Sequence, residues 1–208
     1  MVFDPQSVNG LEIHEDADYA GIRILFWARL GKSRIRMQVD VNFSDEITPT
    51  DMEVEYPTLL LEMPVPLLRG YPPETVIAEK LQAMVYLGEI NSRMKDFYDI
   101  LLLSQSFDFD GVLLQKAIET TFRNRNTPLP LKIPPALTDQ FALQKQSMWE
   151  TGFLRKFLSD LGKLANFAWV VHRLKMFLWP PLSASSKGKA FNQFWKADKR
   201  WSSKPDSV

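Results

Sequence analysis

The segment Gly70–Leu103 constrains the fold of this chain more than any other stretch, because it holds two helix patterns with charges among apolar residues. Pro72 and Pro73 favour a helix start. The apolar residues that follow recur on one arc of a helix: Val76, Ile77, Leu81, Met84, Val85 and Leu87. Lys80 falls inside this arc, where its ammonium group needs either a path to water or an anionic partner.

A second helix is expected to begin near Ser92, which is a suitable N-cap. Its residues from Met94 to Leu103 are apolar on almost every side, which predicts a buried helix. Asp96 and Asp99 stand three residues apart in it and therefore share a face. One interpretation is that the charges of both helices only neutralise one another. That network would consist of Lys80, Arg93, Lys95, Glu79, Asp96 and Asp99.

Two strands are predicted upstream of these helices. Ile22–Leu30 is rich in β-branched and aromatic residues, and Arg34–Phe43 alternates between polar and apolar ones. Gly31 and Lys32 lie between the two segments and suit a turn, so we expect an antiparallel hairpin. Asp40 lies on the polar face of the second strand, and such a face is by itself typical of a half-solvated sheet.

The flanking segments give weaker signals. A short strand is expected at Leu11–Asp16, whereas residues 1–10 have the character of an internal segment, with neither leader nor cap. A long connection is expected over Asp45–Arg69, in which Leu59–Leu61 is either an edge strand or a packed loop.

Further helices are predicted beyond the central pair, the first of them capped by Asp110. Their ranges are Gly111–Arg123, Thr138–Leu143, Lys145–Leu161 and Leu164–Leu178. We therefore predict an α+β fold, with a small mixed or antiparallel sheet over residues 1–69 and a helical C-terminal part over 70–178. Residues 179–208 interleave basic and aromatic residues, which predicts a disordered tail or a partner-docking segment or, alternatively, a surface that contacts RNA.

Composition excludes several classes of site. Lys and Arg together number 25, as do Asp and Glu, so the net charge does not indicate a nucleic-acid partner. The absence of cysteine excludes disulfides and cysteine-based zinc sites, and the two histidines exclude a histidine-rich metal site. No signal peptide and no run of apolar residues long enough for a membrane span are visible, so we expect a cytoplasmic location.

The central helices also resemble a known family. The segments ETVIAEKLQAMVYLG and NSRMKDFYDILLL are similar to the C-terminal signature of the AbiEii/AbiGii toxins, bacterial proteins with a nucleotidyltransferase fold. The resemblance continues upstream through EDADYAGIRILFWARLGKSRIRMQVDVNFSDEITP and downstream through FDFDG and AIETTFRNRNTPLP. It covers roughly residues 1–178.

This resemblance implies a toxin of a toxin–antitoxin or abortive-infection system. Such an enzyme would transfer a nucleoside monophosphate from a nucleoside triphosphate to an acceptor, with RNA as a candidate, using Mg²⁺ or Mn²⁺; an antitoxin protein would be its partner. The resemblance assigns Asp40, Lys80 and Asp96 as catalytic, with Asp40 as the metal-holding acid. Lys80, Lys95 and Asp99 would bind the nucleotide. We expect Asp40, Lys80 and Asp96 to converge on one cavity, with Lys80 no more than about 12 Å from the acids.

The sequence departs from the family pattern at one point. The family places a Gly-Gly or Gly-Ser turn and an Asp-x-Asp pair near its N-terminus, and the nearest counterparts here are Glu15, Asp16 and Asp18 without the glycine turn. Three hypotheses follow. In the first, the chain is an enzyme that is active only if a separate or upstream segment supplies these motifs. In the second, it is a truncated, inactive homologue that binds a nucleotide, RNA or an antitoxin. In the third, it is a coding fragment without activity. We expect the isolated chain to be inactive.

Overall fold

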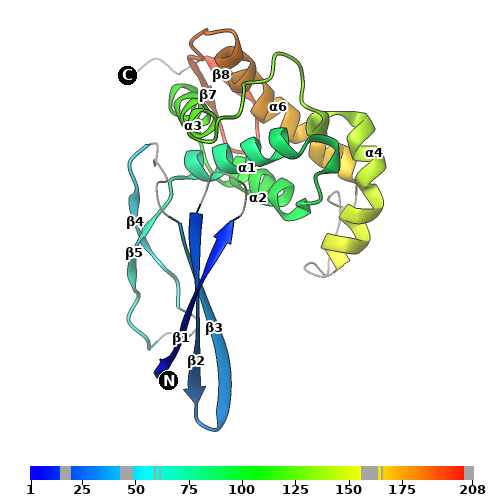
Figure 1. Ribbon diagram of the computed structural model, residues 1–208. Helices are drawn as coiled ribbons and strands as arrows, with labels where there is room; N and C mark the ends of the chain where they lie inside the picture. Colours follow the sequence, from blue (N-terminus) through cyan, green and yellow to red (C-terminus); the bar gives the residue numbers. More distant parts are fainter. Residues whose placement is uncertain are drawn as a thin grey trace. The chain divides into compact units, whose positions relative to one another are not determined.

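The computed structural model describes residues 1–14, 20–42, 49–58, 60, 62–155, 164 and 166–203. The chain divides into two compact units, Met1–Glu46 and Ile47–Val208 (Figure 1). Antiparallel sheets come first along the chain and helices follow, so the predicted α+β class is confirmed.

The first unit is a three-stranded antiparallel sheet. Its strands are β1 (Val2–His14), β2 (Ala20–Leu30) and β3 (Ser33–Asn42), in the order β1-β2-β3. The predicted hairpin is confirmed. Leu30 pairs with Ser33 across a two-residue turn, and Gly31 has a positive φ of 58°, which glycine adopts without steric cost.

Strand β1 is longer than the short strand predicted at Leu11–Asp16, because it begins at Val2. The register shifts between Asp4 and Asn9, and Ser7 Oγ in this irregular stretch accepts a hydrogen bond from the backbone N–H of Trp27 at 2.8 Å. Pro5 and the bulge interrupt the alternation of polar and apolar residues, which is why the strand pattern was not visible in the sequence.

The second unit begins with a hairpin of β4 (Met52–Glu55) and β5 (Leu67–Gly70). The boundary between the units therefore falls between Glu46 and Ile47, whereas the sequence placed it after residue 69. Within the predicted segment Leu59–Leu61, Leu60 is exposed, and Leu59 and Leu61 lie outside the described residues.

Helices make up most of the second unit. They are α1 (Pro73–Leu87), α2 (Met94–Ser106), α3 (Gly111–Asn124), α4 (Asp139–Ser147) and α6 (Phe167–Ser186). Short 3₁₀ segments lie at Gly88–Ile90 and Pro135–Leu137. The predicted cap of α3 is confirmed, since Asp110 Oδ1 accepts a hydrogen bond from the N–H of Val112 at 2.9 Å. None of the helices in the described ranges is long and apolar enough to cross a bilayer.

Helix α2 differs from its prediction in two ways. Arg93, not Ser92, occupies the N-cap position, and the Asn91 side chain accepts a hydrogen bond from the Arg93 N–H at 2.8 Å. The helix is also buried on one side only, because Leu102 is 48% exposed. The apolar character of the sequence therefore overstated its burial.

Helix α4 runs directly into a π-helical segment, Met148–Leu154, so the helices predicted at 138–143 and 145–161 are continuous where they are described. Residues 156–163 and 165 lie outside the described part of the chain. The Trp149 ring stacks on Phe167 at 4.7 Å, and its Nε1 donates a hydrogen bond to the Leu164 carbonyl at 2.6 Å. These contacts join the π-helical segment to the start of α6.

The prediction of a disordered tail over residues 179–208 is wrong for residues 179–203. Helix α6 continues through Pro180 and Pro181 to Ser186, and the chain then forms β7 (Gln193–Trp195) and β8 (Trp201–Ser203) beside β6 (Phe109–Asp110). Trp195 is 1% exposed, and its Nε1 donates a hydrogen bond to the Ser104 carbonyl at 2.7 Å. Aromatic residues of this segment, such as Trp195, therefore pack into the hydrophobic core. Residues 204–208 lie outside the described part of the chain.

Candidate functional site

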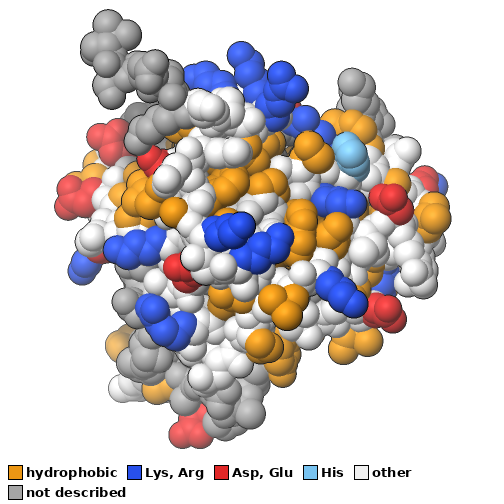
Figure 2. Space-filling model, turned by 90° about the horizontal axis from the view of Figure 1, so that it is seen from above, with side chains coloured by type: hydrophobic (Ala, Val, Ile, Leu, Met, Phe, Trp, Pro, Cys, Tyr) orange, Lys and Arg blue, Asp and Glu red, His pale blue; other side chains and the backbone are white. Residues whose placement is uncertain are grey.

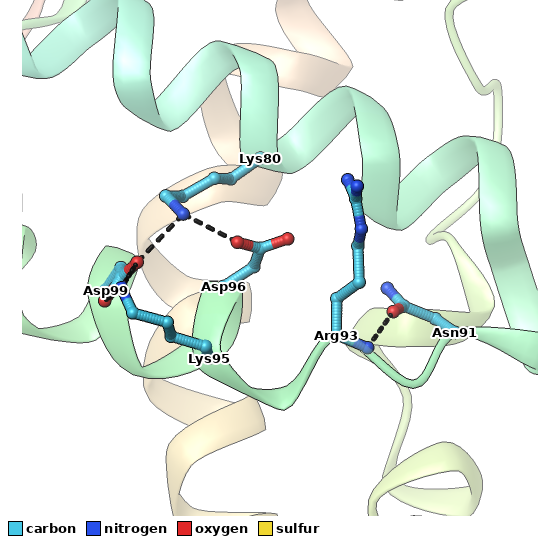
Figure 3. Close-up of polar contacts among 6 residues, drawn as sticks. All are labelled: Lys80, Asn91, Arg93, Lys95, Asp96 and Asp99. Carbon is cyan, nitrogen blue, oxygen red and sulfur yellow. Dashed lines mark hydrogen bonds and ion pairs between the residues drawn. The ribbon is translucent and has the colours of Figure 1, made fainter. Parts of the chain in front are cut away.

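Lys80 on α1 lies against both aspartates of α2. Its Nζ is 2.6 Å from Asp96 Oδ1 and 2.9 Å from Asp99 Oδ2 (Figure 3). The spacing of three residues places both carboxylates on the face of α2 that meets α1. The lysine that interrupts the apolar stripe of α1 therefore finds its partners on the neighbouring helix, as burial of a charged group requires.

A second lysine completes the cluster. Lys95 Nζ lies 2.9 Å from Asp99 Oδ1 and 2.6 Å from Asp99 Oδ2, so Asp99 accepts hydrogen bonds from two ammonium groups. Asp96 contacts Lys80 through Oδ1, and its other oxygen points away from Lys80 in Figure 3. The cluster therefore contains two positive and two negative charges, with one carboxylate oxygen directed away from the ion pairs.

The ion pairs hold the cluster in its charged form. Burial opposes charge on Lys80, but the hydrogen bonds from its Nζ to Asp96 and Asp99 outweigh this effect and raise the pKa of Lys80 above its ordinary value. Burial likewise opposes charge on Asp99, and the hydrogen bonds from Lys95 and Lys80 outweigh it and lower the pKa of Asp99. Both groups therefore stay charged over the neutral pH range.

A pocket of about 440 Å³ adjoins this cluster at the start of α2. Arg93, Lys95 and Asp96 line it on the side of α2, and the π-helical segment provides Met148, Gly152 and Phe153. Lys80 is not among the lining residues. Small-molecule sites commonly combine an apolar wall with a few polar groups in this way, and their volumes run from roughly 300 to 1,000 Å³.

Asp40, the predicted metal-holding acid, lies on β3 in the first unit and is bound by an arginine. Arg23 lies opposite it on the neighbouring strand β2 and donates from Nε and Nη2 to the two carboxylate oxygens, at 2.8 Å each. Gln38 Nε2 adds contacts at 3.1 and 3.2 Å. The hydrogen bond from Arg23 is the main reason that the pKa of Asp40 lies below its ordinary value.

The chain matches a family model over residues 2–173, and the model is described as "Nucleotidyl transferase AbiEii toxin, Type IV TA system". The chain belongs to the AbiEii toxin family. No curated protein and no solved structure gives a significant match to it. The span that matches the AbiEii model contains Asp40, Lys80, Asp96 and Asp99, and it ends within α6 at Arg173.

The predicted AbiEii site residues are brought together in part. Lys80, Lys95, Asp96 and Asp99 form one cluster in the second unit, whereas Asp40 belongs to the first. Its convergence with the cluster therefore stays a prediction, as do the catalytic and binding roles of all these residues.

The described residues include no group of three or more His, Cys, Asp or Glu residues placed to hold a metal ion. Magnesium needs several free oxygen ligands, whereas lysine occupies one oxygen of Asp96 and both oxygens of Asp99, and Arg23 occupies both oxygens of Asp40. Glu15, Asp16 and Asp18, the nearest counterparts of the family's acidic pair, lie outside the described residues.

Sequence reasoning assigned Arg93 only to charge neutralisation. In the described part of the chain, however, its guanidinium forms no hydrogen bond or ion pair, and Arg93 is one of the residues that line the pocket. Its position two residues before Lys95 and Asp96, in the segment that resembles the AbiEii signature, was the available signal. Periodicity could not reveal it, because Arg93 precedes the first full turn of α2.

Proposed function

We propose that this chain acts as the nucleotidyltransferase toxin of a type IV toxin–antitoxin system and transfers a nucleoside monophosphate from a nucleoside triphosphate to an acceptor. The observation that carries this proposal is the cluster of Lys80, Asp96 and Asp99 beside an open pocket, within the span that matches the AbiEii family model. Membership of a toxin–antitoxin family also suggests an antitoxin as partner.

The chemistry of the pocket supports a nucleotide as ligand. The cations at the start of α2 suit phosphate groups, and Met148 and Phe153 offer an apolar wall for a base. The Asp96 oxygen that Lys80 does not bind could accept a hydrogen bond from a ligand hydroxyl. We propose RNA as the acceptor and Mg²⁺ or Mn²⁺ as the metal, with ligands for that ion beyond the residues described above.

A different function has its own support. Because the described residues lack a metal-holding group and Arg23 occupies Asp40, the chain could instead be an inactive homologue that binds a nucleotide, RNA or the antitoxin. Exposed lysines near the C-terminus, among them Lys187 and Lys189, support contact with RNA phosphates. Base stacking is not supported there, because Trp195 is buried and Trp201 packs against Phe177.

A transfer assay with labelled nucleoside triphosphates, total RNA and either Mg²⁺ or Mn²⁺ tests the proposal. We expect label to enter RNA with the wild-type protein and to fall about tenfold or more with Lys80→Met, which breaks two charged contacts. Lys132→Met removes an exposed lysine elsewhere in the same unit and serves as the control. Nucleotide binding without any transfer by the wild-type chain would favour the inactive homologue.

A further inference from the structure

We propose that Arg93 is the residue that binds the phosphate groups of the pocket's ligand, and that Lys80 acts behind it as a positioning residue. The inference rests on the proposed function in taking this ligand to be a nucleotide. It differs from the expectation that followed from the family resemblance, which assigned nucleotide binding to Lys80, Lys95 and Asp99.

The three cations near the pocket differ in the groups that they contact, which indicates that they have different roles. Lys80 contacts two carboxylates and does not line the pocket. Lys95 lines the pocket, but its ammonium group contacts both oxygens of Asp99. Arg93 also lines it and is exposed, and its guanidinium has no partner among the residues that the structure describes. A new anion would therefore have to compete with carboxylates for either lysine but not for Arg93.

The backbone of Arg93 is held in place although its side chain is not. The buried Asn91 side chain accepts a hydrogen bond from the Arg93 N–H at 2.8 Å, and the Arg93 carbonyl accepts one from the Asp96 N–H at 3.0 Å. In Figure 3 the Arg93 side chain extends from this turn toward α1, on the side of Asp96 that faces away from Lys80. Because the backbone is already fixed, only the side chain of Arg93 has to lose conformational entropy when a ligand binds.

The neighbouring groups define the class of ligand. A guanidinium offers paired N–H donors that match a phosphate, and Lys95 adds a second positive charge. Asp96 would repel an anion at its own position but accept a hydrogen bond from a hydroxyl or amino group. Met148 and Phe153 supply the apolar wall. A phosphate-bearing compound with hydrogen-bond donors and a flat apolar part fits this combination, as a nucleoside phosphate does.

Lys80 makes such binding possible without touching the ligand. Asp96 and Asp99 would place two negative charges beside the phosphates, and Lys80 offsets them through contacts of 2.6 and 2.9 Å. The same contacts fix the orientation of Asp96. Replacement of Lys80 should therefore affect both folding and binding, whereas replacement of Arg93 should affect binding alone.

The test measures binding of sodium tripolyphosphate, of each nucleoside triphosphate and of the matching nucleosides to the full chain by calorimetry, beside the melting temperature. We expect Arg93→Gln to weaken binding of both phosphate ligands about ten- to a hundredfold, with no change in nucleoside binding or melting temperature. Arg93→Lys should bind with intermediate affinity. Lys132→Gln, which removes an exposed charge outside the pocket, is the control.

Lys80 variants test the second half of the proposal. Lys80→Met should lower the melting temperature and weaken phosphate binding, and Lys80→Arg should restore both, because arginine keeps the ion pairs with Asp96 and Asp99. A Lys80→Met protein that melts like the wild type but has lost phosphate binding would overturn the positioning role, since Lys80 would then contact the ligand directly.

The outcomes distinguish this inference from the proposed function. Wild-type affinity of Arg93→Gln for tripolyphosphate and nucleotides would overturn the inference, as would a wild-type protein that binds no phosphate compound. Normal transfer by Arg93→Gln with an unchanged KM would overturn it while the proposed function stands. Phosphate binding that depends on Arg93, without transfer to any acceptor, would support the inference and contradict the proposed function.

Discussion

Arg23 and Asp40 face each other across β2 and β3, and the arginine donates to both oxygens of the carboxylate at 2.8 Å. This bidentate pair occupies the oxygens that a metal ion would need. Arg23 therefore competes with any cation for Asp40, and the pair offers a direct test of the role that the family resemblance assigns to this acid.

Replacement of Arg23 by methionine should return the Asp40 carboxyl to ordinary titration. In the wild type its pKa lies below the ordinary value for an aspartate, mainly because of the hydrogen bond from Arg23. Carbon-13 NMR of the aspartate carboxyl groups over an acid titration would measure the change. Gln38→Leu is the matched control, because it removes a weaker contact on the same strand and should shift the pKa less. Equal pKa values in Arg23→Met and wild type would refute the pairing.

Replacement of Lys80 by methionine should lower the free energy of unfolding by about 1–3 kcal/mol, because it leaves Asp96 without its lysine and Asp99 with only one. Urea denaturation followed by circular dichroism would measure this loss. Lys132→Met changes an exposed loop position and should stay within about 0.5 kcal/mol of the wild type. A Lys80→Met protein as stable as this control would show that the cluster contributes nothing to folding.

The same cluster should make stability depend on pH at both extremes. The raised pKa of Lys80 stabilises the fold fully below the unfolded-state value near 10.5, and this contribution is lost as the pH rises through the folded-state pKa. The lowered pKa of Asp99 stabilises the fold above 3.8, and this contribution is lost as the pH falls through the folded-state pKa.

Denaturation curves from acid to alkaline pH would test this dependence. Asp99→Asn should remove part of the acid-side loss and lower stability on the plateau between the two pKa ranges. If the wild type and Asp99→Asn lost stability in parallel below pH 3.8, Asp99 would not be responsible for the acid limb.

The C-terminal segment should prove structural. Trp195→Ala should destabilise the protein by about 3–5 kcal/mol, because it removes a large buried side chain from the core. Trp195→Phe keeps most of the ring but loses the hydrogen bond to the Ser104 carbonyl, so it should cost less, about 1–3 kcal/mol. Thermal denaturation would rank the two variants. If Trp195→Ala were as stable as the wild type, the C-terminal segment would not contribute to the core, and the prediction of a disordered tail would be supported.

Local signals in the sequence predicted the elements that local chemistry determines. The prolines before α1, the Gly-Lys turn between β2 and β3 and the Asp110 cap each act within a few residues, and each was confirmed. The contact of Lys80 with Asp96 was also accessible, because an interrupted apolar stripe requires a partner and the aspartates lie in the next helix.

Features that depend on distant contacts were not predictable. The indole of Trp195 donates a hydrogen bond to a carbonyl 91 residues earlier in the chain, and its neighbours along the sequence mix aromatic, polar and basic residues. The pocket could not be predicted for the same reason. Arg93 and Phe153 both line it but come from distant segments, and no pattern in the sequence connects them. The sequence shows that the C-terminal segment is rich in aromatic residues, but it does not show which of these side chains are buried in the folded core.

The course of α6 has a consequence for exchanging parts between AbiEii relatives. The family match ends at Arg173, but the helix continues to Ser186 and its Phe177 ring stacks on Trp201 of β8. A chimaera joined at the end of the matched region would cut this helix in mid-course and separate Phe177 from the residues before it. Recombination at that point would divide α6. A junction in the loop between α3 and α4 would instead keep α6 on the same segment as β7 and β8.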